Sequence, residues 1–104
     1  YMKAAEKFYI SEILTITKEK LIKRIVKGKS IPSLYCITLP LGNVGVLEIY
    51  EYRELLKDYY RKKDVTVVGC AVSKQDAFVV LRRIVEDIRQ QDSMFRIPEF
   101  FEEG

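Results

Sequence analysis

The spacing of apolar positions changes several times along the chain, and each change marks an expected element. From Phe8 to Ile16 every second residue is apolar except Glu12, and β-branched and aromatic residues are frequent. This alternation predicts a half-buried strand. A helix is an alternative for the same segment, because apolar positions here also fall on one helical face. Residues before Phe8 carry no clear pattern.

Helical spacing follows directly after this segment. Leu21, Ile22 and Ile25 fall on one face of a helix expected over residues 18–29. Thr17 is the predicted N-cap, and Gly28 lies where a helix often ends on a residue with positive φ. An amphipathic helix of two to three turns is therefore expected.

A hairpin and a second helix are expected in the middle of the chain. Leu34–Leu39 is predicted to be a buried strand that ends at Pro40, and Val46–Tyr50 is predicted to be the returning strand. Helical spacing resumes near Tyr52 and continues to Tyr60. If that helix began nearer Val46, there would be no hairpin.

The last strand and helix have the clearest patterns. Val65–Val72 is almost uninterruptedly apolar, as expected of a strand that is buried on both faces. Ser73 with Asp76 three positions later resembles a capping box at the start of a helix. The apolar stripe of that helix predicts an end near residues 91–93.

Together these elements predict an α+β fold with the order β-α-β-β-α-β-α. We expect a small two-layer domain with a mixed or antiparallel sheet of about four strands and two to three helices. The order is analogous to the ferredoxin-like split β-α-β arrangement. Residues 1–93 are expected to form one globular domain, and residues 94–104 a C-terminal tail.

The composition supports a single globular domain with one hydrophobic core. The 104 residues are 48% hydrophobic and 12% aromatic, which suffices for a single domain. No apolar run approaches the roughly 20 residues that span a bilayer, so no membrane insertion is expected. Cys36 and Cys70 lie in apolar runs that are typical of buried free thiols. A cytoplasmic location is expected, because two cysteines do not make the dense disulfide framework of a small secreted domain.

The absence of histidine argues against catalysis. It removes the Ser-His and Cys-His nucleophile pairs and every histidine-containing zinc site. We find no converging carboxylate pair in the sequence. The chain is therefore predicted to be non-enzymatic, with no catalytic residues, no metal site and no cofactor.

Two segments are rich in cations. The helix over 18–29 has a basic outer face, and Tyr59–Lys63 places aromatic rings beside cations, as in sites that bind bases and phosphates. The net charge of +3 is modest for a dedicated nucleic-acid-binding protein, so nucleic acid is the less favoured partner. The candidate contact residues are Lys20, Lys23, Arg24, Lys27, Tyr60, Arg61, Lys62 and Lys63.

The tail is unusually apolar for a chain end. Its side chains could pack on their own domain, on a second copy or on another protein. The first 63 residues carry a net charge of +6 and residues 64–104 carry −3, which could steer self-association. The preferred function is protein–protein contact, most simply as a homodimer. The candidate docking residues are Phe95, Ile97, Phe100 and Phe101.

A small anion is the remaining ligand class. Loop amides near Gly42, Asn43 and Gly45 could surround it, and so could the helix start at Ser73 and Lys74. Neither segment matches a phosphate-binding glycine motif. Regulatory anion binding is therefore the second alternative to protein contact, after RNA or other single-stranded nucleic acid.

Overall fold

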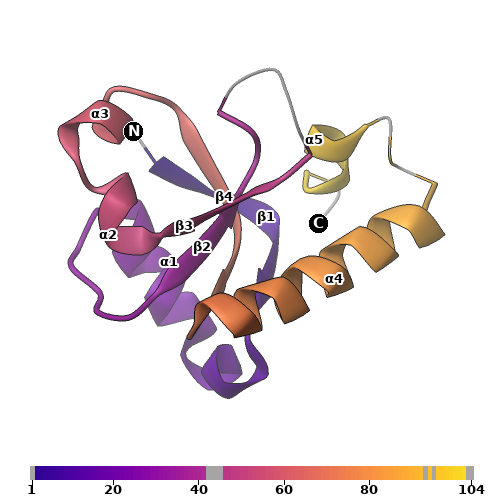
Figure 1. The fold of residues 1–104 in the computed structure, drawn as a ribbon, viewed down its shortest axis with the longest axis horizontal. Helices are drawn as coiled ribbons and strands as arrows, with labels where there is room; N and C mark the ends of the chain where they lie inside the picture. Colours follow the sequence, from indigo (N-terminus) through magenta and orange to yellow (C-terminus); the bar gives the residue numbers. More distant parts are fainter. Residues whose placement is uncertain (1, 42–45, 93, 95, 103–104) are drawn as a thin grey trace.

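A mixed four-stranded sheet with the order β1-β4-β2-β3 forms the centre of the computed structural model (Figure 1). β1 (Met2–Ile10) runs parallel to β4 (Val65–Ala71). β2 (Tyr35–Thr38) is antiparallel to β4 and to β3 (Glu48–Glu51). The structure describes residues 2–41, 46–92, 94 and 96–102.

Helices cover both faces of the sheet. α1 and α2 pack against one face, where Ile25, Tyr52 and Leu55 join the core. α4 and α5 pack against the other, and Figure 1 shows α4 on the opposite side of the strands from α1. The helical bounds are η1 (Glu12–Thr17, a 3-10 helix), α1 (Lys18–Val26), α2 (Tyr52–Leu55), α3 (Asp58–Arg61), α4 (Lys74–Gln90) and α5 (Ile97–Phe100).

The predicted fold class is confirmed, since the chain is an α+β domain with a mixed sheet of four strands and two main helices. The structure departs in two ways from the ferredoxin-like analogy and from the expected two-layer arrangement. β1 and β4 are direct neighbours, so no strand separates this parallel pair. The helices also lie on both faces, because β4 carries buried side chains on each of its faces.

The predicted strand over Phe8–Ile16 is partly wrong. β1 begins at Met2 and ends at Ile10, and the following residues form η1. The chain turns at the buried Ser11, whose amide donates to the Cys70 carbonyl at 3.1 Å. Alternation continues past this turn only because η1 carries exposed apolar side chains, which periodicity alone does not distinguish from buried ones.

The other expected elements agree with the structure to different degrees. Antiparallel pairing of β2 with β3 confirms the hairpin, whose predicted turn lies largely outside the described residues. The single helix expected from Tyr52 is instead two short helices, α2 and α3. Ser73 is confirmed as an N-cap, with its side chain accepting from the Asp76 amide at 3.1 Å. Thr17 occupies the predicted N-cap position of α1, but its side chain makes no capping bond and its hydroxyl donates to the Leu14 carbonyl instead.

Cys36 and Cys70 lie opposite each other on β2 and β4 as buried free thiols. Burial raises the pKa of both thiols, to about 12 for Cys70. In the part of the chain that the structure describes, no helix combines the length and apolar character needed to cross a bilayer.

Candidate nucleic-acid interface

The two basic segments of the sequence meet at one hollow. It lies between the C-terminal end of α1 and the α2–α3 segment, on the side of the molecule where Figure 1 marks the N-terminus. Its volume is about 420 Å³. We call it the α1–α3 hollow, and its lining residues are Met2, Val26, Lys27, Gly28, Leu55, Leu56, Tyr60 and Arg61.

The end of α1 places Lys27 at this hollow. The Lys27 amide donates to the Lys23 carbonyl at 3.1 Å, and the Gly28 amide donates to the Ile25 carbonyl at 3.0 Å. Gly28 then turns the chain with φ of 69°, a conformation that favours glycine. Gly28 is confirmed as the residue that follows the helix end, although α1 stops at Val26 and is shorter than the expected 18–29, with Lys27 as its C-cap.

Tyr52 holds this helix end against α2. Its ring is fully buried, and its hydroxyl donates to the Lys29 carbonyl at 2.6 Å. Burial raises its pKa to about 12, so the hydroxyl keeps its proton at neutral pH. Tyr52 therefore positions the hollow without lining it. In sequence it reads only as the start of a helix, because its partner lies 23 positions away.

An aromatic group forms the α3 side of the site. Tyr60 contacts Tyr50 and Tyr59 edge to face, with ring centroids 5.4 and 4.9 Å away. Tyr59 is 64% exposed, and Lys63 Nζ lies 4.6 Å from its ring centroid. This arrangement presents a cation and an aromatic ring together at the surface, as stacking sites for bases do.

The charge of the hollow is one-sided. Lys27 and Arg61 are its charged lining residues, and no carboxylate lies among the described residues that line it. The neighbouring Glu54 forms an ion pair with Lys57 at 3.0 Å. Among the described residues, the lining of the hollow thus carries two basic side chains and no acidic one.

The structure brings together three of the eight candidate nucleic-acid contacts, namely Lys27, Tyr60 and Arg61. The remaining α1 cations Lys20, Lys23 and Arg24 are exposed, and Arg24 donates to the Ser30 carbonyl at 2.9 Å. Sequence reasoning missed the apolar floor, because side chains such as Val26, Leu55 and Leu56 show only helical periodicity. Of the other candidates, Lys62 is exposed and Lys63 is half-buried.

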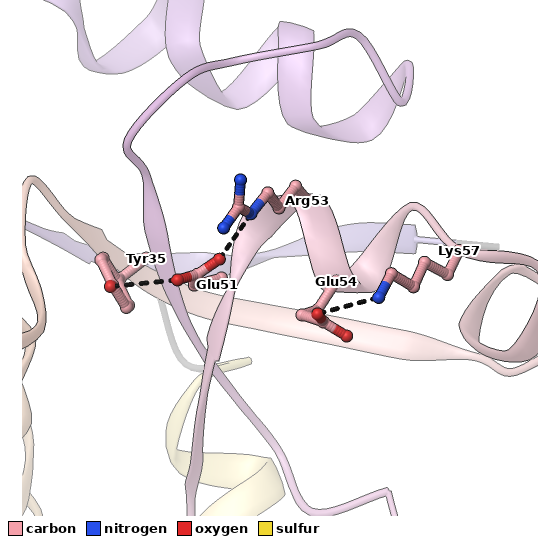
Figure 2. Close-up of polar contacts among 5 residues, drawn as sticks. All are labelled: Tyr35, Glu51, Arg53, Glu54 and Lys57. Carbon is pink, nitrogen blue, oxygen red and sulfur yellow. Dashed lines mark hydrogen bonds and ion pairs between the residues drawn. The ribbon is translucent and has the colours of Figure 1, made fainter.

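A second hollow, of about 480 Å³, lies at the start of α4 and the end of β3. Figure 2 draws two contacts among its lining residues, in which Glu51 accepts from Tyr35 Oη at 3.3 Å and from Arg53 Nε at 2.6 Å. The bond from Arg53 lowers the pKa of Glu51. We call this the α4-start hollow, and its lining residues are Ser30, Ile31, Pro32, Ser33, Leu34, Tyr35, Glu51, Arg53, Val72, Ser73 and Lys74.

The α4-start hollow contains only part of the candidate anion site. Ser73 and Lys74 line it, but the Ser73 side chain caps α4 and the Glu51 carboxylate shares the space. The other candidates, Gly42, Asn43 and Gly45, lie outside the described residues. The geometry gives a bound anion less support here than at the α1–α3 hollow.

The described docking candidates of the tail are buried, whereas residues of a contact surface would be exposed. Ile97, Phe100 and Phe101 are buried in the core of their own chain, beneath the α4 face of the sheet. Packing on their own domain was the alternative to docking on a partner. Their side chains are therefore not exposed for a partner, and Phe95 lies outside the described residues.

Comparison with protein-family models, curated proteins and solved structures finds no match to this chain. Among the described residues, no group of three or more His, Cys, Asp and Glu side chains is placed to hold a metal ion. The geometry of this chain is thus the basis for any functional argument.

Proposed function

We propose that this domain binds single-stranded nucleic acid, RNA in particular, at the α1–α3 hollow, and that it acts by binding and not by catalysis. One observation carries the proposal: Lys27 and Arg61, from two basic segments far apart in sequence, line one hollow together with Tyr60. Aromatic rings and cations around a groove are the features that hold unpaired bases and their phosphates.

Each part of the hollow has a role in this proposal. Lys27 and Arg61 pair with backbone phosphates, where counterion release supplies most of the affinity. Tyr59, which contacts the lining residue Tyr60 from outside the hollow, offers an exposed ring for base stacking, and the apolar floor accepts the face of a base. A duplex is a poorer ligand, because its bases are already paired and stacked.

A cytoplasmic location belongs to the proposal. Cys36 and Cys70 face each other on neighbouring strands as free thiols. A reducing compartment keeps such a pair unlinked, and it is also where RNA is abundant.

Fluorescence anisotropy with a labelled oligouridylate tests the proposal at several salt concentrations. Binding is expected to weaken as salt rises, with a log–log slope of roughly −0.7 for each phosphate contact. Replacing Lys27→Gln and Arg61→Gln together should remove roughly 1.4 from that slope. The matched control is Arg82→Gln with Arg89→Gln, which removes the same charge from exposed positions of α4.

Equal losses in both double variants would show that total charge alone drives binding, and would overturn the assignment of the site. Tyr59→Leu provides an independent readout, because removing a stacking ring costs about 1–3 kcal/mol per base without changing charge. Affinity that is unchanged in Tyr59→Leu would contradict the stacking role.

A further inference from the structure

η1 carries the most exposed aliphatic side chains of the described chain. Ile16 is 99% exposed and Ile13 is 78% exposed, and η1 contains no buried residue. Side chains three positions apart eclipse each other on a 3-10 helix, so these two isoleucines form one row. Single exposed apolar residues are common, but a projecting aliphatic row indicates a contact surface.

The α4-start hollow lies at the same end of the molecule as this row. Ser11, directly before η1, accepts a hydrogen bond from the Val72 amide at 3.3 Å, and Val72 lines the hollow. Its volume of about 480 Å³ falls within the roughly 300–1,000 Å³ of sites that hold small ligands. Apolar side chains that include Ile31, Pro32 and Leu34 contribute to its lining.

We propose that two copies of this chain associate about a two-fold axis, each placing the Ile13–Ile16 row of η1 in the α4-start hollow of the other. A two-fold interface uses the same patch on both copies, and it therefore needs a projection and a recess on one side of the molecule. Both are present at this end of the sheet.

The charges around the two features are compatible with such a contact. Exposed Glu12 lies in η1 and exposed Glu19 lies shortly after it, and exposed Lys74 lines the hollow, where Arg53 is already paired with Glu51 at 2.6 Å.

This self-association uses a different surface from the proposed nucleic-acid site, and it would increase the avidity for nucleic acid. η1 precedes the first residue of α1, whereas the α1–α3 hollow lies at the last turn of that helix. The proposed interface therefore leaves the basic hollow open in each copy. Two hollows on one assembly raise the avidity for a strand that is long enough to reach both.

Sedimentation velocity over a range of concentrations tests the proposal. The unaltered protein should reach a mass twice that of the 12.2 kDa chain, and Ile16→Asp should sediment at the mass of one chain. Thr15→Asp is the matched control, because Thr15 is an exposed residue of η1 outside the isoleucine row and should leave the dimer intact. Circular dichroism of both variants verifies that they remain folded.

Disulfide trapping provides the second measurement. A tagged Ile16→Cys chain mixed with an untagged Val72→Cys chain should form a mixed disulfide under mild oxidation, whereas the unaltered chain should not, since Cys36 and Cys70 are buried. A monomer at every concentration would overturn the proposal. A dimer that persists in Ile16→Asp would also overturn it. A monomer that binds anionic vesicles through Ile16 would overturn it as well.

Discussion

The amide of Lys7 donates a 3.0 Å hydrogen bond to the carbonyl of Phe101, which joins the outer edge of β1 to the C-terminal segment. β1 is an edge strand, and its ladder with β4 is interrupted between Ala4 and Tyr9. The Phe101 carbonyl meets the strand at this interruption. The tail thus covers a sheet edge of its own chain, where an unpaired strand would invite association.

Truncating the tail side chains should destabilise the whole domain. Phe101→Ala is expected to lower the free energy of unfolding by about 3–5 kcal/mol, because Phe101 is fully buried against the α4 face and Tyr9. Urea denaturation measures the change. Glu99→Ala, on the exposed side of α5, is the control and should have little effect. An equally small effect of Phe101→Ala would mean that the tail is not part of the core.

The N-cap residue of α4, Ser73, is expected to contribute to the stability of the domain. Ser73→Ala removes the acceptor for the Asp76 amide and should cost about 1 kcal/mol of stability. Ser30→Ala is the control, since Ser30 is exposed in the loop before β2. Thermal unfolding of both variants would show whether only Ser73 has the expected effect.

Gly69 is expected to be intolerant of any side chain. A Cβ at this position would lie 2.9 Å from the Tyr9 carbonyl oxygen, so β1 and β4 would have to separate. Gly69→Ala should therefore lower stability by about 1–3 kcal/mol, as overpacking usually does. Urea denaturation measures the change. An unchanged free energy of unfolding in Gly69→Ala would show that β1 does not approach β4 as closely as described.

The stability of the domain should fall at alkaline pH. The pKa of Cys70 is raised from 9.0 to about 12 in the folded state, because burial disfavours the thiolate. The unfolded thiol ionises near pH 9 while the folded one stays neutral. The neutral Cys70 thiol thus makes its full contribution to the free energy of unfolding below pH 9. This contribution is lost as the pH rises toward 12, at about 1.4 kcal/mol per pH unit.

Replacing Cys70→Ala should reduce the loss of stability above pH 9, at some cost in packing at neutral pH, and part of the loss should remain because burial also raises the pKa of Cys36 and Tyr52. Gln90→Ala, at an exposed position of α4, is the control, because it leaves every titratable group in place, and its slope should match that of the unaltered chain. Equal slopes in the Cys70→Ala variant and the unaltered chain would contradict the role assigned to thiol burial.

Local patterns predicted the elements that local chemistry determines. β4 and α4 were found because a continuous apolar run and a serine cap act within a few residues. The end of β1 was missed, because exposed Ile13 and Ile16 continue the alternation of the strand. The place of the tail was also open, since burial of Phe101 depends on contacts with residues more than 90 positions away.

The candidate site was predicted in its chemistry and not in its geometry. Clustered cations and tyrosines indicated Lys27, Tyr60 and Arg61, because composition is visible along the chain. That they line one hollow depends on how α1 and α3 pack on one face of the sheet, and no local pattern contains that information.

Chemical-shift mapping tests the central claim most directly. In a ¹⁵N-labelled sample titrated with oligouridylate at low salt, the amides of residues 26–29 and 59–63 should shift together and saturate at one affinity. The amides on the outer face of α4 serve as internal controls and should stay in place. Shifts that are absent from both segments, or that are spread evenly over every exposed cation, would contradict binding at the α1–α3 hollow.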